Sequence, residues 1–309
     1  MKKKFPESLK KGDKIAIISP AGAVEPAQLE KGIQMIKAKG FEPVLGDNLY
    51  SKFFNGYNYA GTEEQRIEDM NWALNDPEIS AIWASRGGYG CQHLIENLNL
   101  KGFIKNPKWY IGYSDNTVIQ SYLLKKGFAS IHGQTIKTSS FGVTEESYDL
   151  IFNILKGKAL KYTLKSNHFN KDGNAEGELV GGNLALVYAL LGTKYSFDFK
   201  DKILFIEDIG ENFYALDRMM MSLELAGVFT KIKGLIIGGI TNMGDEKDNK
   251  QYEESFDEFA YKLISERISK YRFPTVFAFP NGHIHNNIPL ILGAEVSLKV
   301  GKNVSLTFN

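Results

Sequence analysis

One serine of this chain lies where a nucleophile would be expected. Ser114 follows a short β-rich run that ends at Gly112, and a helical pattern begins at Asp115. A serine at such a strand–turn–helix junction is exposed at the carboxyl edge of a sheet, as in a nucleophile elbow. The backbone N–H of Asp115 would then lie at a helix N-terminus, where it can stabilise an oxyanion. Asn116 replaces the second glycine of the elbow motif, and Ser114 could instead simply cap the helix.

A glycine-rich segment, residues 85–90, directly follows the β-rich run that ends at Ala84. A turn of this kind can present backbone N–H groups to an anion. It lacks the lysine and the hydroxyl residue of a P-loop, and a nucleotide phosphate site is one interpretation of the segment. The other interpretations are a tight structural turn and a strand end that supplies oxyanion donors beside Ser114. Arg86 could pair with a substrate carboxylate or make a structural ion pair.

Acidic and imidazole side chains occur at two further strand ends. Glu207 and Asp208 end an apolar run, where they could orient a histidine, bind a metal or be solvated acids of a turn. His283 and His285 lie in a loop after another strand, and either catalysis, a zinc site with the two acids or a surface position would explain them. The single cysteine, Cys91, is more typical of a small buried side chain than of a nucleophile.

The composition restricts the function classes. The chain has 309 residues and a formal net charge of +1, which gives no general attraction to nucleic acid or to an anionic membrane. One cysteine excludes a disulfide framework. The N-terminal lysines precede Phe5 and Pro6 rather than an apolar signal region, and no run of about 18 apolar residues exists. We therefore expect a cytoplasmic globular protein with about two domains.

The elements that must position these residues alternate between strand and helix in the first half of the chain. The expected strands are residues 14–19, 42–45, 79–84 and 108–112, and the expected helices are residues 27–39, 62–74, 115–126 and 144–156. Thr62 and Gln65 have the spacing of a capping box. Short apolar strands that alternate with helices predict a parallel, flavodoxin-like sheet for an N-terminal domain of residues 1–156.

The second half has a different pattern. Residues 157–176 are polar with little periodicity and are the expected linker to a C-terminal domain of residues 177–309. That domain is predicted to be mixed α/β and rich in strands, with strands at 178–180, 202–206, 235–240, 275–279, 294–300 and 304–308, and helices at 184–191, 214–225 and 252–269. The charged run at residues 245–250 is expected to be a solvated loop.

Taken together and in this order, the motifs resemble the serine LD-carboxypeptidase family, which includes muramoyltetrapeptide carboxypeptidases and microcin-immunity peptidases. The resemblance is nearly end to end, and the combination of Arg-Gly-Gly-Tyr-Gly with Gly-Tyr-Ser-Asp is specific. The segments that carry it are residues 12–22, 60–62, 66, 76–79, 84–90, 111–115, 132–133, 177–184, 206–211, 215–218 and 282–283. The resemblance implies a catalytic triad of Ser114, Glu207 and His283.

The same resemblance implies the rest of the site. Backbone amides of Gly88 and Asp115 would form the oxyanion hole, and the substrate would be a murein tetrapeptide cut between its L-centred diamino acid and terminal D-Ala. Arg86 is the candidate for the free carboxylate of that substrate. No metal or other cofactor is expected, and the family suggests a homodimer. Because Ser114 lies in the first half of the chain and the other triad residues in the second, we expect the active site between the domains.

Three alternatives stay open. A microcin-immunity-type peptidase that cleaves a peptidyl nucleotide analogue would use the same residues. A metallohydrolase would use His283, His285 and Glu207 as ligands. A ligand-binding module without catalysis would leave Ser114 unreactive toward a serine-directed covalent probe.

Overall fold

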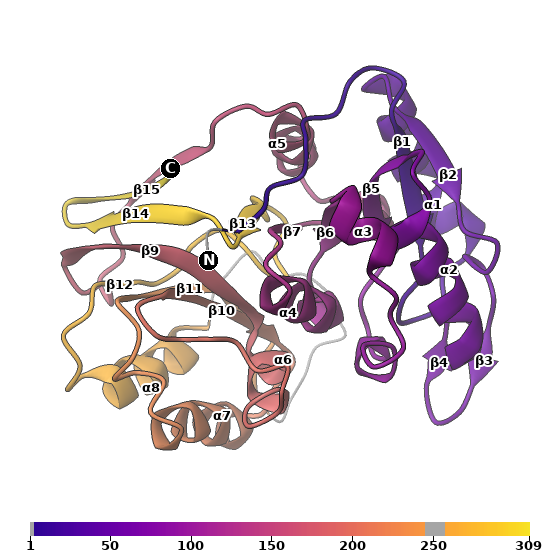
Figure 1. The fold of residues 1–309 in the computed structure, drawn as a ribbon. Helices are drawn as coiled ribbons and strands as arrows, with labels where there is room; N and C mark the ends of the chain where they lie inside the picture. Colours follow the sequence, from indigo (N-terminus) through magenta and orange to yellow (C-terminus); the bar gives the residue numbers. More distant parts are fainter. Residues whose placement is uncertain (1–2, 245–256) are drawn as a thin grey trace. The chain divides into compact units, whose positions relative to one another are not determined.

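The computed structural model describes residues 3–244 and 257–309, and the chain forms two compact units. The N-terminal unit comprises residues 1–158 together with 288–290, and the C-terminal unit comprises residues 159–287 and 291–309. Each unit is built around its own β-sheet with helices packed against it (Figure 1). The α/β fold class predicted for the chain is confirmed, with a largely parallel sheet in the first unit and a mixed sheet in the second.

The sheet of the N-terminal unit has the strand order β13-β7-β6-β5-β1-β2. Its strands are β1 (Lys14–Ile18), β2 (Glu42–Leu45), β5 (Ile79–Ala84), β6 (Trp109–Gly112), β7 (Ser130–His132) and β13 (Leu290–Leu292). Pairing is parallel from β2 through β1, β5 and β6 to β7. The chain moves from β1 to its neighbour β2 and then returns to the other side of β1 to form β5. The carboxyl ends of β1 and β5 therefore form a topological switch point.

Helices connect these parallel strands. They are α1 (Pro26–Ala38), α2 (Glu63–Asn75), α3 (Lys101–Lys105), α4 (Thr117–Lys125) and α5 (Glu145–Leu155), with a small hairpin of β3 (Phe53–Phe54) and β4 (Asn58–Tyr59) before α2. Right-handed crossovers place α1 on one face of the sheet and α2 to α4 on the other, because the direction of strand addition reverses at β1. In keeping with this, α2 packs against α3, and α1 packs against the short 3₁₀ turn Lys137–Phe141.

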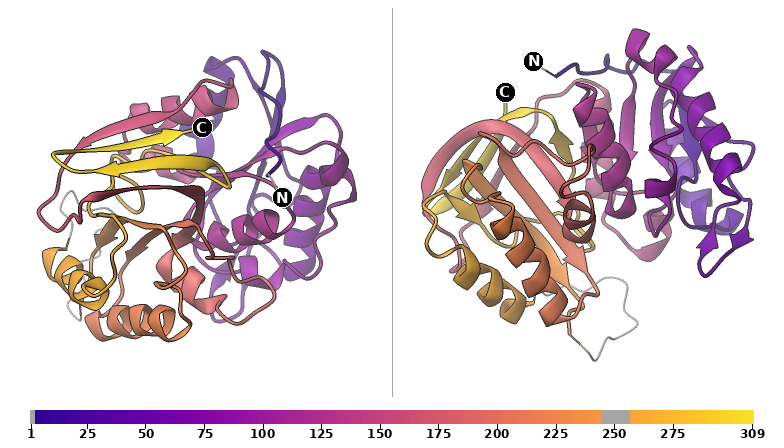
Figure 2. Two further views of the ribbon diagram at one scale, coloured as in Figure 1. Left: turned by 60° about the vertical axis from the view of Figure 1, so that its left-hand side comes forward. Right: turned by 60° about the horizontal axis from the view of Figure 1, so that its bottom comes forward.

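The sheet of the C-terminal unit has the order β12-β11-β10-β9-β14-β15-β8. Its strands are β8 (Lys161–Lys165), β9 (Gly173–Asn183), β10 (Ile203–Ile209), β11 (Gly234–Thr241), β12 (Thr275–Val276), β14 (Glu295–Val300) and β15 (Asn303–Phe308). Strands β9 to β12 pair in parallel, and β14, β15 and β8 add to β9 in antiparallel fashion. The helices are α6 (Leu184–Ala189), α7 (Phe213–Leu225) and α8 (Glu258–Ile268), and α7 packs against both of the others (Figure 2).

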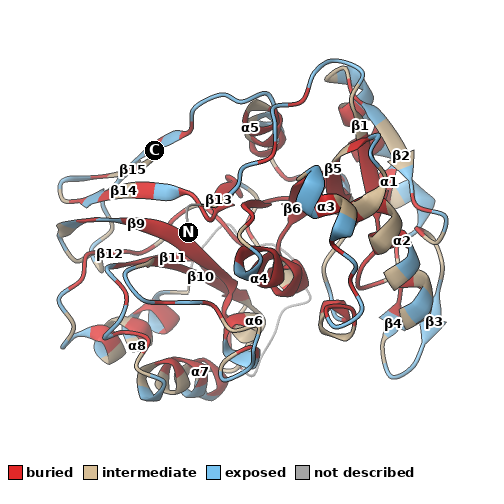
Figure 3. Cartoon of the chain, viewed as in Figure 1, coloured by how far each residue is buried: buried red, intermediate tan, exposed pale blue. Residues whose placement is uncertain are grey.

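The centres of both sheets are apolar and buried, which explains why their strands were predictable (Figure 3). All residues of β6 and β11 are buried, as are the first six of β10. Continuous apolar runs of this kind are typical of parallel strands covered on both faces. Strand β7 has three residues, too few for a periodic pattern, and escaped prediction.

The segment predicted to be a linker contains regular structure. Strand β8 and the first residues of β9 lie within residues 157–176, and they pair with β15 and β14. The lysines at both ends of β8 are exposed, whereas Tyr162 between them is buried. Charged side chains are common on edge strands because they oppose pairing with other chains, and they also make such a strand look like a loop.

Two other predictions fall partly or wholly outside the described residues. The charged run at residues 245–250 is one, and residues 252–256 of the predicted helix 252–269 are the other. Among the described residues, that helix begins at Glu258. No helix in residues 3–244 and 257–309 is both long and apolar enough to cross a bilayer.

The predicted capping box at the start of α2 is confirmed. The Thr62 side chain accepts a hydrogen bond from the Gln65 backbone, and the Gln65 side chain accepts one from the Thr62 backbone. Replacing Thr62 by alanine should lower the free energy of unfolding of the N-terminal unit by about 1 kcal/mol, whereas Thr62→Ser keeps the hydroxyl and should have a smaller effect. All three tryptophans, Trp72, Trp83 and Trp109, lie in this unit, so urea unfolding followed by tryptophan fluorescence reports on it selectively. An unchanged midpoint in Thr62→Ala contradicts this role of the cap.

Candidate active site

Ser114 has a backbone conformation that is unusual for its residue type. Its φ of 61° lies in the left-handed region, directly after β6 and at the first residue of a 3₁₀ turn, Ser114–Asn116, that leads into α4. Such a conformation costs of order 1–3 kcal/mol and persists where the surroundings impose it, often at functional sites. This is the strand–turn–helix geometry that the sequence predicted for a nucleophile elbow. The Ser114 side chain is half-buried rather than enclosed.

Asn116 holds the elbow in place. Its amide donates to the Tyr113 carbonyl at 2.9 Å, and its side-chain oxygen accepts from the Tyr110 hydroxyl at 2.6 Å. The Asn116 side chain fits because Gly112 has none: a Cβ on Gly112 would lie 2.7 Å from Cγ of Asn116. Asn116 is also the N-cap of α4, so the alternative in which Ser114 caps this helix is wrong. Asn116, which replaces the second glycine of the elbow motif, therefore supports the turn.

The glycine-rich segment lies directly against this serine. A Cβ on Gly87 would lie 2.9 Å from Cβ and 3.1 Å from Oγ of Ser114, so the two backbones can approach only because Gly87 has no side chain. Gly88 has a φ of +108°, which L residues rarely adopt. The Asp115 carboxylate is buried and accepts from the Cys91 backbone at 2.8 Å, and burial raises its pKa. This bond fastens the far end of the glycine-rich segment to the elbow.

Cys91 and Arg86 flank this arrangement. The Cys91 thiol is free and fully buried, and burial raises its pKa well above the usual value, so it does not behave as a reactive thiolate. Arg86 donates from Nη1 to the carbonyl of Ala23 at 2.9 Å. In the described part of the chain no carboxylate pairs with Arg86, so the structural ion pair considered from the sequence is not found.

Glu207 and His283 meet within the C-terminal unit although they are 76 residues apart in the chain. Nδ1 of His283 and Oε2 of Glu207 are 2.8 Å apart, and the Glu207 side chain has no solvent exposure. Burial lowers the pKa of His283, but the charge of Glu207 and its hydrogen bond outweigh burial, with a smaller contribution from Asp208, and the net pKa is raised. The carboxylate thereby fixes Nδ1 as the protonated ring nitrogen.

Backbone packing explains why the carboxylate points at His283. A Cβ on Gly282 would lie 2.8 Å from Oε2 of Glu207, and one on Gly238 would lie 2.4 Å from the Asn281 carbonyl and 3.1 Å from Cβ of Glu207. The β10–β11 register shifts between Ile206 and Asp208, where Gly238 and Gly239 oppose Glu207. Glycines on both sides thus let two backbone segments close over Glu207. Sequence reasoning used Gly282 as part of the motif before His283, but it did not anticipate that Gly282 contacts Glu207, and it did not single out Gly238 or Gly239.

Asp208 has a different environment from its neighbour. Its carboxylate accepts from the side chain of Asn183 at 2.9 Å and from the backbone of Ala185 at 3.0 Å and Ile209 at 2.9 Å. Burial and the charge of Glu207 raise its pKa to about 7. Both acids are buried, so the alternative of solvated turn residues is wrong. The Asp208 carboxylate ties the start of α6 to the end of β10, whereas the Glu207 carboxylate accepts the hydrogen bond from His283.

The zinc alternative needed a cluster of ligands around His283. Among residues 3–244 and 257–309, no group of three or more His, Cys, Asp or Glu side chains could hold a metal ion. The pair of Glu207 and His283 is instead a carboxylate–imidazole arrangement, which acid–base catalysts commonly use.

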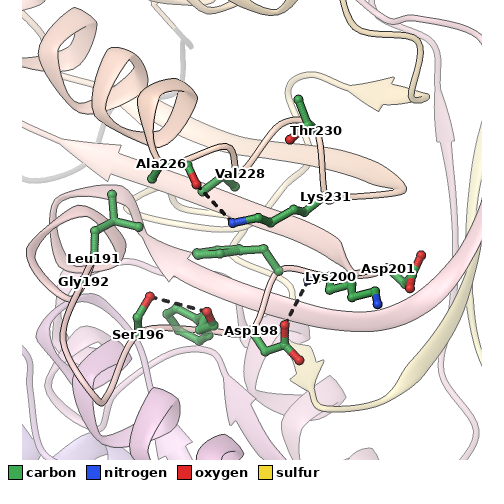
Figure 4. Close-up of a pocket in the computed structure, with 12 residues that line it drawn as sticks. Leu191, Gly192, Ser196, Asp198, Lys200, Asp201, Ala226, Val228, Thr230 and Lys231 are labelled. Carbon is green, nitrogen blue, oxygen red and sulfur yellow. Dashed lines mark hydrogen bonds between the residues drawn. The ribbon is translucent and has the colours of Figure 1, made fainter.

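A pocket of about 630 Å³ elsewhere in the C-terminal unit contains none of the expected site residues (Figure 4). Lys200 and Asp201 precede β10 and Lys231 precedes β11, so this pocket lies at the amino ends of two parallel strands. The Lys231 ammonium donates to the Ala226 carbonyl at 3.1 Å across it. Ligands of open parallel sheets bind at the carboxyl ends, where β10 carries Glu207. This pocket is not the candidate active site.

Comparison with known proteins is decisive for the family. The LD-carboxypeptidase N-terminal domain matches residues 15–133, and the LD-carboxypeptidase C-terminal domain matches residues 176–298. A Synechocystis protein named as a carboxypeptidase is 32% identical over 295 residues, which cover 95% of this chain and 93% of that protein. The chain belongs to the LD-carboxypeptidase family.

Two further relatives of this LD-carboxypeptidase family enzyme have more specific names. A murein tetrapeptide carboxypeptidase of Pseudomonas aeruginosa is 28% identical over 281 residues, covering 87% of this chain and 88% of that protein. The crystal structure of a muramoyltetrapeptide carboxypeptidase from Oxalobacter formigenes matches with a TM-score of 0.83 at 27% identity, covering 96% of this chain and 98% of that one. The family resemblance read from the sequence is confirmed.

The Glu207–His283 pair gives a prediction that does not depend on any substrate. Glu207→Gln removes the charge that raises the pKa of His283 and leaves the burial that lowers it, so this pKa should fall below 6.5. Histidine ring resonances followed by NMR over pH measure the change, and the chain has five histidines to assign. Asp208→Asn is the matched control, because Asp208 acts on His283 through charge alone and should shift the pKa less. A His283 pKa unchanged in Glu207→Gln contradicts the assigned coupling.

Proposed function

We propose that this LD-carboxypeptidase family enzyme is a serine peptidase acting on murein tetrapeptides. It hydrolyses the amide bond between the L-centred diamino acid and the terminal D-Ala. The observation that carries the mechanism is the hydrogen bond of 2.8 Å between the buried carboxylate of Glu207 and the imidazole of His283. The substrate class follows from the relatives, because the Pseudomonas and Oxalobacter proteins are named as murein and muramoyl tetrapeptide carboxypeptidases.

The proposed reaction uses Ser114, His283 and Glu207 as a triad. Oγ of Ser114 attacks the scissile carbonyl while Nε2 of His283 removes the hydroxyl proton. His283 then donates that proton to the amine of the departing D-Ala, and the peptide remains attached as an ester on Ser114. A water molecule, deprotonated by His283, attacks the ester, and the returned proton restores Ser114. Glu207 holds the ring through Nδ1 and stabilises the imidazolium at each step.

The oxyanion hole is assigned to the backbone N–H groups of Gly88 and Asp115. Support for Gly88 comes from the contact of the neighbouring Gly87 with Ser114. Support for Asp115 comes from its place in the first turn after the serine, where backbone N–H groups point away from the helix. Donors fixed in this way stabilise the charge that develops on the scissile carbonyl oxygen without reorganising during the reaction.

Substrate binding and assembly complete the proposal. Arg86 is assigned to the free carboxylate of the terminal D-Ala, because a guanidinium binds a carboxylate through parallel hydrogen bonds. A net charge of +1 suits a small peptide that carries both charges, with local cations in place of a basic surface. The enzyme is proposed to act in the cytoplasm as a homodimer in recycling cell-wall peptides, and sedimentation velocity tests the oligomeric state.

The decisive experiment is mass analysis of products from a murein tetrapeptide ending in D-Ala and from the same peptide ending in L-Ala. The wild-type enzyme should release D-Ala from the first and cleave the second far more slowly. Ser114→Ala should lower kcat by at least about 10⁴-fold while the peptide still binds, because the nucleophile is lost and the binding groups remain. Ser140→Ala, which removes an exposed hydroxyl in the same unit, is the matched control and should be fully active.

Each contrary result has a defined meaning. Full activity of Ser114→Ala overturns the serine mechanism. Cleavage of a peptidyl nucleotide analogue with no release of D-Ala favours the microcin-immunity type of peptidase. Equal cleavage of the two tetrapeptides overturns the proposed L,D specificity.

A further inference from the structure

Two cationic side chains lie at the topological switch point of the N-terminal sheet. The ends of β1 and β5 meet there, since these strands pair in parallel from Lys14 to Ile18 of β1. Arg86 follows β5 by one residue, after Ser85. Lys137 comes from a distant segment, but its backbone N–H donates to the Ser85 carbonyl at 2.8 Å. Ligands of doubly wound sheets bind outside the carboxyl ends of the strands at this point.

The Arg86 side chain reaches from the end of β5 to the loop that follows β1. Its Nη1 donates to the Ala23 carbonyl at 2.9 Å. A Cβ on Gly22 would lie 3.0 Å from Nε and 3.1 Å from Cζ of Arg86, so the guanidinium packs closely against this backbone. Within the described residues the protein uses Arg86 to hold one carbonyl, and a guanidinium has five N–H donors. The remaining donors suit a ligand with two acceptor oxygens.

Lys137 is half-buried beside this arginine. Its ammonium lies 5.5 Å from the centre of the Phe141 ring, and no carboxylate of the described residues forms an ion pair with it. Burial and then the positive charge of Arg86 lower the pKa of Lys137 to about 8, and Glu25 opposes them weakly. The Glu25 carboxylate is itself paired with Lys52 at 2.5 Å. Two cations thus act on each other in a partly desolvated place.

The Lys137 backbone is held firmly. It begins the 3₁₀ turn Lys137–Phe141, which packs on α1. The approach is close, because a Cβ on Gly32 of α1 would lie 2.6 Å from Cγ2 of Ile136. Only the side chain of Lys137, and not its backbone, therefore has to be ordered when it binds a ligand.

Two cations held close together favour an anion beside them. Like charges brought together away from water disfavour each other, and a bound anion removes that cost. The switch point also adjoins the elbow, since Gly87 next to Arg86 contacts Ser114. We propose that Lys137 and Arg86 together bind the terminal carboxylate of the substrate and so restrict cleavage to its last peptide bond. This inference rests on the proposed function and adds Lys137 as a determinant of specificity.

The test compares two substrates that differ only at the C-terminus. One is the murein tetrapeptide with a free carboxylate, and the other is the same peptide with a C-terminal amide. Wild-type enzyme should prefer the acid in kcat/KM by about 10- to 100-fold, since hydrogen bonds to charged groups contribute more than neutral ones. Lys137→Met keeps the length of the side chain and removes the charge, so it should reduce this preference about tenfold, mainly through KM for the acid. Lys137→Arg should restore most of it.

The control is Lys108, a fully buried lysine that also has a lowered pKa. Lys108 also has a pKa of about 8, but its ammonium donates to the Ala73 carbonyl at the end of α2, and it precedes β6 at the amino edge of the sheet. Lys108→Met should reduce stability and leave the ratio of acid to amide cleavage as in the wild type. A ratio that changes equally in both variants shows a general effect of lost lysines and overturns the proposal.

The remaining outcomes separate the two levels of inference. If the wild-type enzyme cleaves and prefers the acid but Lys137→Met keeps the full preference, the role of Lys137 is overturned and the proposed function stands. If Lys137→Met loses activity equally on acid and amide, Lys137 supports the fold rather than the carboxylate, and the proposal is again overturned. If the wild-type enzyme releases D-Ala from neither peptide, the proposed function itself fails.

Discussion

Burying a carboxylate out of water is costly unless other groups replace the lost hydration, and Glu207 is fully buried. Its bond to Nδ1 of His283 supplies a polar partner, and His283 in turn owes its raised pKa to Glu207, because burial alone would lower it. The hydrogen bond between the two groups therefore offsets the cost of burying each of them. The C-terminal unit is arranged around this pair: β10 delivers Glu207, the loop before β13 delivers His283, and Gly238 and Gly282 let the backbone close over the carboxylate.

In the N-terminal unit the key residue is held by a strained backbone rather than by a buried charge. Ser114 is held at a φ of 61°, a conformation that an isolated serine avoids. The buried side chain of Asn116, bonded to Tyr113 and Tyr110, opposes relaxation of the turn. In both units glycines stand where another backbone or side chain must approach the key residue. Both devices lie at the carboxyl ends of parallel strands, the edge at which such sheets bind ligands.

The parts of this arrangement that follow local rules were predictable. Strand β5 was expected at its observed bounds because an apolar run is closed on both sides by turn residues, and the Thr62 cap has a recognised spacing. Strand β8 was not expected, because an edge strand with exposed lysines has the composition of a loop. The support given by Asn116 was missed for a different reason: its effect depends on Gly112 and Tyr110 in three dimensions.

Local sequence patterns could not predict contacts between residues that are far apart in the chain. Glu207 and His283 are 76 residues apart, and either residue alone has several ordinary explanations. Their pairing was anticipated through the order of motifs along the whole chain, which is information about a family rather than about any one segment. Lys137 belongs to no such motif. Its position beside Arg86 becomes evident only in the structure, where its backbone N–H donates to the Ser85 carbonyl.

The distribution of charge between the units has a chemical logic of its own. Within the C-terminal unit the charge of Glu207 and, when it is ionised, that of Asp208 raise the pKa of His283 and so favour the imidazolium. A cation placed among them would neutralise Glu207 and weaken its hold on the ring. Arg86 and Lys137, the cations proposed to bind the substrate carboxylate, belong instead to the N-terminal unit, which also carries Ser114. Under the proposed mechanism, the groups that raise the pKa of His283 and the groups that bind an anion lie in separate units, so a substitution in one set need not alter the charges of the other.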